Sequence, residues 1–144
     1  MLFLGKNDYS MDERGRVPMP PRYREALMQG LILTQATPDR CIRVYPADVF
    51  EQQAALYMES PVTTRAGRVS RRAFFSGAFP AELDKQGRVL IPAALREWAN
   101  LDAQGQASVA IVGAGEGIEI WNSADFEAAL VAEEDEFRQA LGSE

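Results

Sequence analysis

The stretch Asp12-Glu-Arg-Gly-Arg-Val-Pro-Met-Pro-Pro-Arg-Tyr-Arg-Glu25 decides the fold, because the chain contains it twice. The second copy is Asp84-Lys-Gln-Gly-Arg-Val-Leu-Ile-Pro-Ala-Ala-Leu-Arg-Glu97, and seven of the fourteen aligned positions are identical. Farther along each copy, Ile42-Arg-Val-Tyr45 matches Ile118-Glu-Ile-Trp121. The chain therefore contains two versions of one unit of about 45 residues.

Each version of the unit predicts the same order of secondary structure. Asp-x-x-Gly-Arg is typical of a turn, because the Asp side chain accepts nearby backbone N–H groups and Gly adopts a positive φ. A short strand is predicted on each side of this turn, and Pro20 and Pro92 stand where a short helix begins. Two further strands follow, and a closing helix starts near Ala47 in one unit and near Ala124 in the other. The predicted order is β-β-α-β-β-α, twice.

The repeat also divides the chain into parts. They are domain 1 (5–52), a linker helix (53–76), domain 2 (77–124) and an acidic C-terminal helix (125–144). In the linker, Ser60 is the predicted N-cap and Pro61 the first helical residue. A unit of this size buries too little apolar surface to be stable alone. We therefore expect the two units to share strands and to form an internal pseudo-dimer.

Composition excludes several classes of function. The 144 residues include no histidine and one cysteine, Cys41, so the chain has no Ser-His-Asp or Cys-His catalytic site, no histidine-ligated metal and no multi-cysteine zinc site. No apolar run approaches the roughly 18 residues of a membrane span, and the N-terminus does not resemble a secretory signal. We expect a cytoplasmic protein that is not an enzyme, with no cofactor, metal, membrane contact or small-molecule substrate. Asp or Glu acting as a general base is the one catalytic route left open.

Charge is unevenly distributed along the chain. The net charge is −6, but residues 116–144 hold nine acids and one base, a net of −8. Residues 1–115 hold 14 bases and 12 acids, a net of +2, and 13 of the 15 bases in the chain are arginine. Such a chain can bind a polyanion locally although its total charge is acidic. Charge alone is equally compatible with an acidic segment that only improves solubility.

The repeated motif resembles a known class of domain. Asp-x-x-Gly-Arg-Val, followed by Met19-Pro20 or Ile91-Pro92 and a short helix, is similar to the SpoVT/AbrB-like swapped-hairpin DNA-binding domains. Two such motifs in a chain of this length, with an arginine-rich helix between them and an acidic helix at the end, resemble the MraZ family. The resemblance covers nearly the whole chain.

This resemblance implies a fold and a function. The fold is α+β: tandem units that form a pseudo-dimeric, swapped-hairpin β-barrel with flanking helices. The family consists of bacterial transcriptional regulators of the cell division and cell wall gene cluster. Its members are DNA-binding, ring-shaped homo-oligomers associated with the nucleoid, and they recognise tandem short G-rich promoter repeats.

Arg16 and Arg88 are the main candidate DNA-binding residues. Each follows a turn, where its planar guanidinium group can bind guanine O6 and N7 in the major groove. The alternative is an ion pair, Asp12–Arg16 or Asp84–Arg88, that only stabilises the turn. Spacing does not distinguish these two roles, since a structural pair would recur as well. The resemblance favours DNA contact, with the aspartates orienting the arginines.

Arg14 and Lys85 lie beside the turns and are expected to bind phosphate groups, which adds affinity but little sequence preference. The residues expected to shape the turns and orient the arginines are Asp12, Gly15, Asp84 and Gly87. Glu13 aligns with Lys85 and would repel phosphate, so the two units are not equivalent. Arg24 and Arg96, inside the short helices, are expected to form salt bridges at the edge of the core.

The linker carries Arg65, Arg68 and Arg72 on one predicted helical face. This face either lines a DNA-binding surface or pairs with the acidic last helix of the same or another subunit, and the second role is favoured.

The alternative function for the whole chain is an antitoxin-like or scaffold oligomer that binds a protein partner. Against it, the C-terminal segment has the pattern of an ordered amphipathic helix and not of a disordered partner-wrapping tail.

Overall fold

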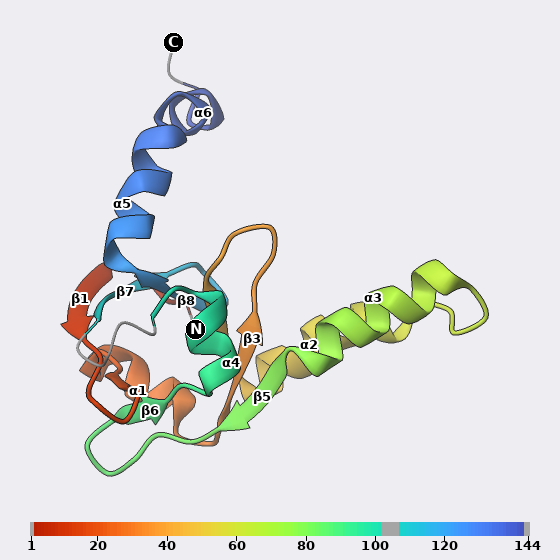
Figure 1. Cartoon of the computed structure of the whole chain (residues 1–144), viewed down its shortest axis with the longest axis horizontal. Helices are drawn as coiled ribbons and strands as arrows, with labels where there is room; N and C mark the ends of the chain where they lie inside the picture. Colours follow the sequence, from red (N-terminus) through yellow and green to blue (C-terminus); the bar gives the residue numbers. More distant parts are fainter. Residues whose placement is uncertain (1, 102–106, 143–144) are drawn as a thin grey trace.

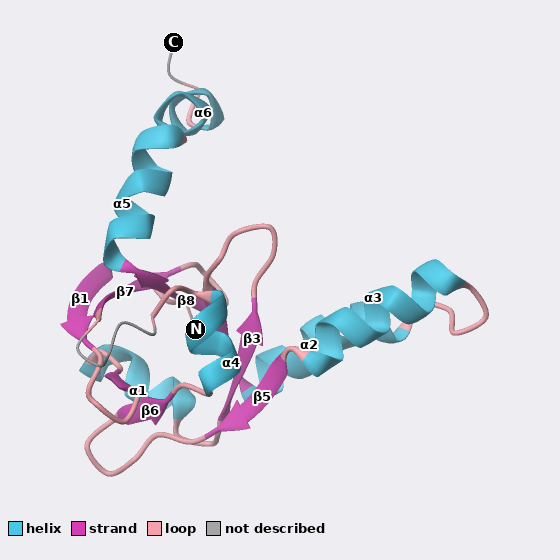
Figure 2. Ribbon diagram, in the orientation of Figure 1, coloured by secondary structure: helices cyan, strands magenta, loops and turns pink. Residues whose placement is uncertain are grey.

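Two helical projections leave a β-rich body in different directions (Figure 1). The computed structural model describes residues 2–101 and 107–142. One projection is a pair of helices, α2 (Ala47–Met58) and α3 (Arg65–Ser76) (Figure 2). The other is the C-terminal pair, α5 (Ser123–Ala132) and α6 (Glu134–Ala140). The body holds all the strands, so the predicted α+β class is confirmed.

The strands form one six-stranded sheet and one two-stranded ribbon. The sheet has the order β1-β7-β8-β4-β3-β5, and every neighbouring pair is antiparallel. Its strands are β1 (Lys6–Ser10), β3 (Leu31–Gln35), β4 (Ile42–Pro46), β5 (Ala78–Ala81), β7 (Ser108–Gly113) and β8 (Ile118–Asn122). The ribbon pairs β2 (Arg16–Pro18) with β6 (Arg88–Leu90). Each unit thus contributes four strands, as the repeat predicts.

The two units exchange strand partners. The first strand of unit 1, β1, pairs with β7 of unit 2, and the first strand of unit 2, β5, pairs with β3 of unit 1. The ribbon also joins the units, with Val17 opposite Val89. Both valines are fully buried in one hydrophobic cluster that draws on both units. The expectation of shared strands is therefore confirmed. Within the described ranges no pairing joins β1 to β5, so closure into a barrel stays a prediction.

The short helices begin where the prolines predict. Helix α1 (Pro21–Leu27) follows Pro20, and α4 (Ala93–Trp98) follows Pro92. Proline suits this position because the first backbone N–H groups of a helix have no partner within the helix. Both helices turn apolar side chains into the shared core, α1 through Tyr23 and Leu27 and α4 through Leu95.

Helix α3, in the linker, begins at a different residue from the predicted one. Helix α2 (Ala47–Met58) extends into the linker, a turn follows, and α3 spans Arg65–Ser76. The prediction of Ser60 as N-cap is wrong, because the Thr64 hydroxyl accepts a 3.0 Å hydrogen bond from the Gly67 N–H. Pro61 lies in the turn, and its carbonyl oxygen would be 1.8 Å from a Cβ atom at Gly67. The turn therefore packs against α3 and fixes where that helix begins.

The C-terminal segment forms two helices and not one. Helix α5 (Ser123–Ala132) ends at Glu133, whose φ of −102° and ψ of 7° leave the helical region, and α6 (Glu134–Ala140) follows. The first turn of α6 carries three acidic residues. Carboxylates are favoured at a helix N-terminus, where the backbone dipole is positive, and repel one another in a helix interior. The acidic run thus favours a new helix start over a continuous helix. Residues 143–144 of the predicted helix lie outside the described residues.

Candidate nucleic-acid interface

The first repeated turn is organised by one carboxylate. The Oδ1 atom of Asp12 accepts the backbone N–H groups of Arg14 and Arg16, both at 2.9 Å. The Gly15 N–H donates to the Asp12 carbonyl at 3.0 Å, and Gly15 has a φ of +84°. This φ is rare for residues with a side chain, so glycine completes the turn. The predicted turn is confirmed.

The second turn repeats this geometry. The Oδ1 atom of Asp84 accepts the N–H groups of Gln86 and Arg88, again at 2.9 Å. Gly87 has a φ of +77°, and its N–H donates to the Asp84 carbonyl at 3.0 Å. The ribbon joins the two turns, since the Met19 N–H donates to the Gly87 carbonyl and the Ile91 N–H to the Gly15 carbonyl, both at 2.9 Å. The turns are thus two equivalent corners of one surface.

Both aspartate–arginine ion pairs form. The Nε–H of Arg16 donates to Asp12 Oδ2 at 2.7 Å, and the Nε–H of Arg88 donates to Asp84 Oδ2 at 3.1 Å. The Nη1 group of Arg88 also lies 3.5 Å from Asp12 Oδ2, so the two pairs meet. The arginine side chains keep 28% and 26% of their surface exposed. They are therefore half-buried, held by the carboxylates but still in contact with solvent.

The electrostatics of the turns follow from these hydrogen bonds. The backbone N–H of Arg16 is the main cause that lowers the pKa of Asp12, and the backbone N–H of Arg88 does the same for Asp84. The arginine side chains add to both effects. Both aspartates are therefore ionised at neutral pH, and each holds its arginine through the Nε–H alone. This leaves the two Nη groups of Arg16 without a partner in the part of the chain that the structure describes.

Arg24 and Arg96 have a role that the sequence did not indicate. Arg24 donates from Nε to the Met19 carbonyl at 2.9 Å, and Arg96 donates from Nη1 to the Ile91 carbonyl at 2.7 Å. Each also lies against the turn of the other unit: a Cβ at Gly87 would be 2.2 Å from Arg24 Nε, and one at Gly15 would be 2.2 Å from Arg96 Nη1. The arginines thus support the turns across the pseudo-dimer. The only sign of this role in the sequence was that both copies of the repeat have arginine at this position.

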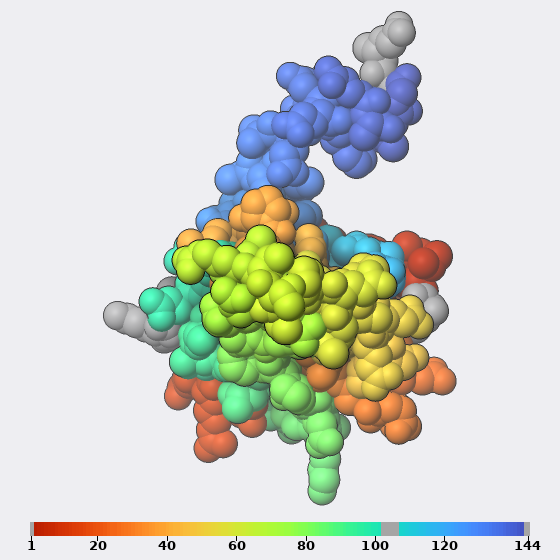
Figure 3. Space-filling view, turned by 90° about the vertical axis from the view of Figure 1, so that its right-hand side faces the viewer, coloured from red at the N-terminus to blue at the C-terminus, as the bar shows by residue number. Residues whose placement is uncertain are grey.

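The remaining candidate residues surround this surface. Arg14, Lys85 and Glu13 are all exposed, at the positions that the turns predict. The turns lie at the end of the body away from α5 and α6, as Figure 1 shows. In Figure 3 the green segment that leads into the second turn is likewise at the lower end, and the blue helices are at the upper end. A large partner can therefore reach the turns without meeting the C-terminal helices.

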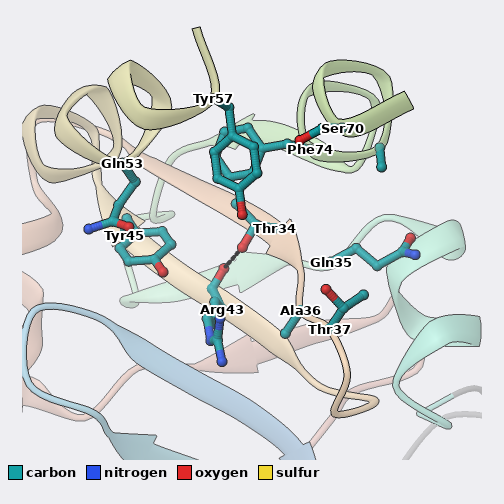
Figure 4. A pocket seen from close by; sticks show the side chains of 11 residues that line it. Thr34, Gln35, Ala36, Thr37, Arg43, Tyr45, Gln53, Tyr57, Ser70 and Phe74 are labelled. Atoms are coloured by element: carbon teal, nitrogen blue, oxygen red, sulfur yellow. Dashed lines mark hydrogen bonds between the residues drawn. The ribbon is translucent and has the colours of Figure 1, made fainter. Parts of the chain in front are cut away.

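A separate pocket of about 250 Å³ lies between the sheet and the α2–α3 pair (Figure 4). Figure 4 shows the Tyr57 hydroxyl pointing from α2 toward Thr34, with Arg43 on the next strand. The Thr34 hydroxyl already donates to the Arg43 carbonyl at 3.1 Å, and Arg43 Nε lies 3.6 Å from Glu119 Oε2. None of the predicted site residues lines this pocket. The repeated turns are therefore the better candidate site.

Other features have structural roles. Cys41 is buried, and burial raises the pKa of its thiol to about 12, so it is not a nucleophile. Tyr45 in β4 and Trp121 in β8 are buried. Within residues 2–101 and 107–142, no three acidic or cysteine side chains gather to hold a metal ion. No helix in these ranges has the length and hydropathy to span a membrane.

Comparison with known proteins gives a consistent result. The model of the MraZ family, described as "MraZ protein, putative antitoxin-like", matches residues 2–72 and 74–141. A relative from Nocardioides sp. is 41% identical over 122 residues, which cover 85% of this chain and 81% of the relative. Relatives from Micrococcus luteus and Salinispora tropica are 38% and 37% identical, over 96% and 94% of this chain and 93% and 92% of their own.

All three relatives carry the name "Transcriptional regulator MraZ". The expectation that the chain is not an enzyme is confirmed, because this is a family of regulators. Identity of this level over most of both chains, together with a family match from residue 2 to residue 141, shows that the protein belongs to the MraZ family.

Proposed function

We propose that this protein is a sequence-specific DNA-binding transcriptional regulator of the bacterial cell division and cell wall gene cluster. It acts in the cytoplasm, associated with the nucleoid, and recognises tandem short G-rich promoter repeats. The name shared by its relatives supports the regulatory function. Its two SpoVT/AbrB-like domains, residues 5–52 and 77–124, together form a swapped-hairpin barrel, which the exchange of strand partners between the units supports.

The paired turns carry this proposal. Arg16 and Arg88 occupy equivalent positions on two corners of one surface. Each is fixed through Nε. Arg16 can direct both Nη groups at guanine O6 and N7, while Arg88, whose Nη1 also contacts Asp12, can direct Nη2. Because Asp12 and Asp84 fix the arginines in advance, less side-chain entropy is lost when the base is bound. The ion pairs and the DNA contacts are thus parts of one mechanism.

The neighbouring charges supply affinity. Arg14 and Lys85 are exposed beside the turns and bind phosphate groups. Glu13 stands at the position of Lys85 in the other unit and opposes phosphate there. The turn of the second unit therefore attracts the phosphate backbone more strongly than the turn of the first. Because these contacts are electrostatic, DNA binding weakens as salt concentration increases.

Assembly strengthens these contacts. Residues 1–115 carry a net charge of only +2, so one chain binds DNA weakly. A ring of several copies presents many turns to tandem repeats, and each bound turn raises the effective concentration of the next. We therefore include a ring-shaped homo-oligomer in the proposal.

The test is a mobility shift titration with two DNA fragments, one carrying tandem G-rich repeats and one with the same bases scrambled. Replacing both arginines, Arg16→Ala with Arg88→Ala, is expected to remove most of the preference for the repeats, because a bidentate base contact contributes about 1–3 kcal/mol of discrimination. The matched control, Arg14→Ala with Lys85→Ala, also removes two positive charges from the turns. It is expected to weaken binding to both fragments equally.

One result would overturn the assignment of these residues. If the Arg16→Ala/Arg88→Ala protein keeps the preference of the parent for the repeats at matched salt, the two arginines only stabilise the turns.

The second candidate function is an antitoxin-like or scaffold oligomer that binds a protein partner. The description of the matching family model as antitoxin-like favours it. Affinity purification of the full chain distinguishes the two functions. A single stoichiometric protein partner without retained DNA supports the second candidate, and promoter DNA without such a partner supports the first.

A further inference from the structure

The outer face of the ribbon formed by β2 and β6 holds two pairs of side chains. Opposite residues of an antiparallel pair turn their side chains to the same face, and the next pair along turns them to the other face. Val17 and Val89 are opposite each other and fully buried, so they face the core. The pairs on either side of them therefore face outward. These pairs are Arg16–Leu90 and Pro18–Arg88.

Each candidate base-reading arginine thus has an apolar neighbour across the ribbon, and the neighbour of Arg16 is the more exposed one. Leu90 keeps 56% of its surface open to solvent, whereas Pro18 is half-buried. Within the two described ranges, Leu90 is the only large apolar residue that is exposed in a strand. The two units therefore differ at this position of the repeat.

The surroundings of Leu90 indicate a role for this exposure. Single exposed apolar residues are common on protein surfaces, so exposure alone indicates nothing. Leu90, however, lies opposite Arg16, and it lines the same surface hollow as Arg14 of the first turn. The proposed function assigns Arg16 to a base and Arg14 to a phosphate group. An apolar side chain thus stands within the surface that meets the DNA.

The major groove offers one apolar group to such a side chain. Base edges there present hydrogen-bond donors and acceptors, and in addition thymine carries a C5 methyl group that cytosine lacks. Leucine has no polar atom in its side chain, so this methyl group is the base-edge feature that it can recognise. Opposite Cα atoms in an antiparallel pair are about 4.5–5.5 Å apart. Successive bases of one strand are about 3.4 Å apart along the axis, so Leu90 reaches the base pair next to the one that Arg16 binds.

We propose that Leu90 determines specificity by contacting the methyl group of a thymine next to the guanine that Arg16 binds. The inference rests on the proposed function, because it requires the outer face of the ribbon to enter the major groove. Pro18 has the equivalent place beside Arg88, but its short ring is half-buried and extends less far from the strand. The methyl group is therefore recognised beside Arg16 and not beside Arg88.

Replacing thymine by uracil tests this contact, since uracil lacks only the methyl group. Two DNA fragments carry the same tandem G-rich repeats with a thymine on each side of every guanine run, and in one of them deoxyuridine replaces these thymines. In mobility shift titrations the parent is expected to bind the uracil fragment about threefold to fourfold more weakly for each methyl group that Leu90 covers. Leu90→Ala is expected to bind both fragments equally, with the affinity of the parent for the uracil fragment.

Two further variants keep the result specific. Leu90→Met retains a long apolar side chain and is expected to keep the preference for thymine. Val131→Ala truncates an exposed apolar residue on α5, at the opposite end of the body from the turns, and is expected to behave like the parent. Circular dichroism checks that each variant is folded, and comparing the ratio of the two affinities removes any effect of uracil on the DNA itself.

The inference is overturned if the parent binds the thymine and uracil fragments equally, or if Leu90→Ala keeps the ratio of the parent. A parent that prefers the G-rich repeats over the scrambled fragment but does not distinguish thymine from uracil removes this inference and leaves the proposed function standing. A parent that shifts none of the fragments removes both.

Discussion

A single carboxylate organises each repeated turn. In Asp12 one oxygen accepts two backbone N–H groups and the other accepts the Arg16 side chain. Asp84 makes the equivalent bonds. The sequence predicted this turn because Asp and Gly stand at fixed offsets within five residues. It did not predict that Arg24 lies against Gly87, since this contact joins two units and no local pattern encodes it.

The lowered pKa values of Asp12 and Asp84 predict a pH dependence of stability. Folding lowers both pKa values below the ordinary 3.8, so the ionised carboxylates stabilise the folded state. This contribution is fully present above the unfolded pKa and is lost as pH falls through the folded one. We therefore expect the free energy of unfolding of the parent to fall more steeply below about pH 4 than that of Asp12→Asn with Asp84→Asn.

Urea denaturation at a series of pH values from neutral to about 2 measures this difference. The control is Glu25→Gln with Glu97→Gln, which neutralises two exposed carboxylates on α1 and α4 and is expected to keep the parent profile. A parallel profile for the parent and the Asp12→Asn/Asp84→Asn variant would contradict the role given to these carboxylates.

At the scale of elements, the strands and short helices could be predicted and the ends of the long helices could not. Alternating apolar residues and the two prolines located β3, β4, α1 and α4 because these signals are local. The start of α3 depends instead on how the turn at Pro61 packs against Gly67. Ser60 and Thr64 are both suitable N-cap residues, and only the packing of the turn selects Thr64.

Thr64→Ala therefore tests the element boundary. Loss of the hydroxyl leaves the Gly67 N–H unsatisfied, at a cost of about 1 kcal/mol in helix stability. Amide hydrogen exchange in the first turn of α3 is expected to become roughly fivefold faster, while exchange in the sheet stays unchanged. The matched control is Thr63→Ala, one residue earlier and outside the cap. Equal acceleration by both substitutions would show that Thr64 is not the N-cap.

At the scale of the whole molecule, the small size of each unit predicted that the two halves share a core. The sequence did not indicate which strands pair, because register depends on contacts between residues far apart in the chain, 44 to 50 positions in β3–β5 and 70 to 74 in β2–β6. Nor did it indicate that α3 and the C-terminal helices diverge. Their opposite charges suggested contact, and only the direction in which each helix leaves the sheet shows that the contact is not made within one chain.

The shared core predicts that damage to one unit unfolds the other. Leu27 is fully buried in unit 1, and Leu27→Ala is expected to cost about 2–5 kcal/mol. Both tryptophans, Trp98 and Trp121, belong to unit 2. Because β1–β7, β3–β5 and β2–β6 join the units, tryptophan fluorescence and far-ultraviolet circular dichroism should report one unfolding transition, and Leu27→Ala should shift both midpoints equally.

The control, Met28→Ala, truncates an exposed neighbour and should leave the midpoint unchanged. If Leu27→Ala lowers the circular dichroism midpoint while the fluorescence midpoint stays at the parent value, the units fold independently and the strand exchange does not couple them.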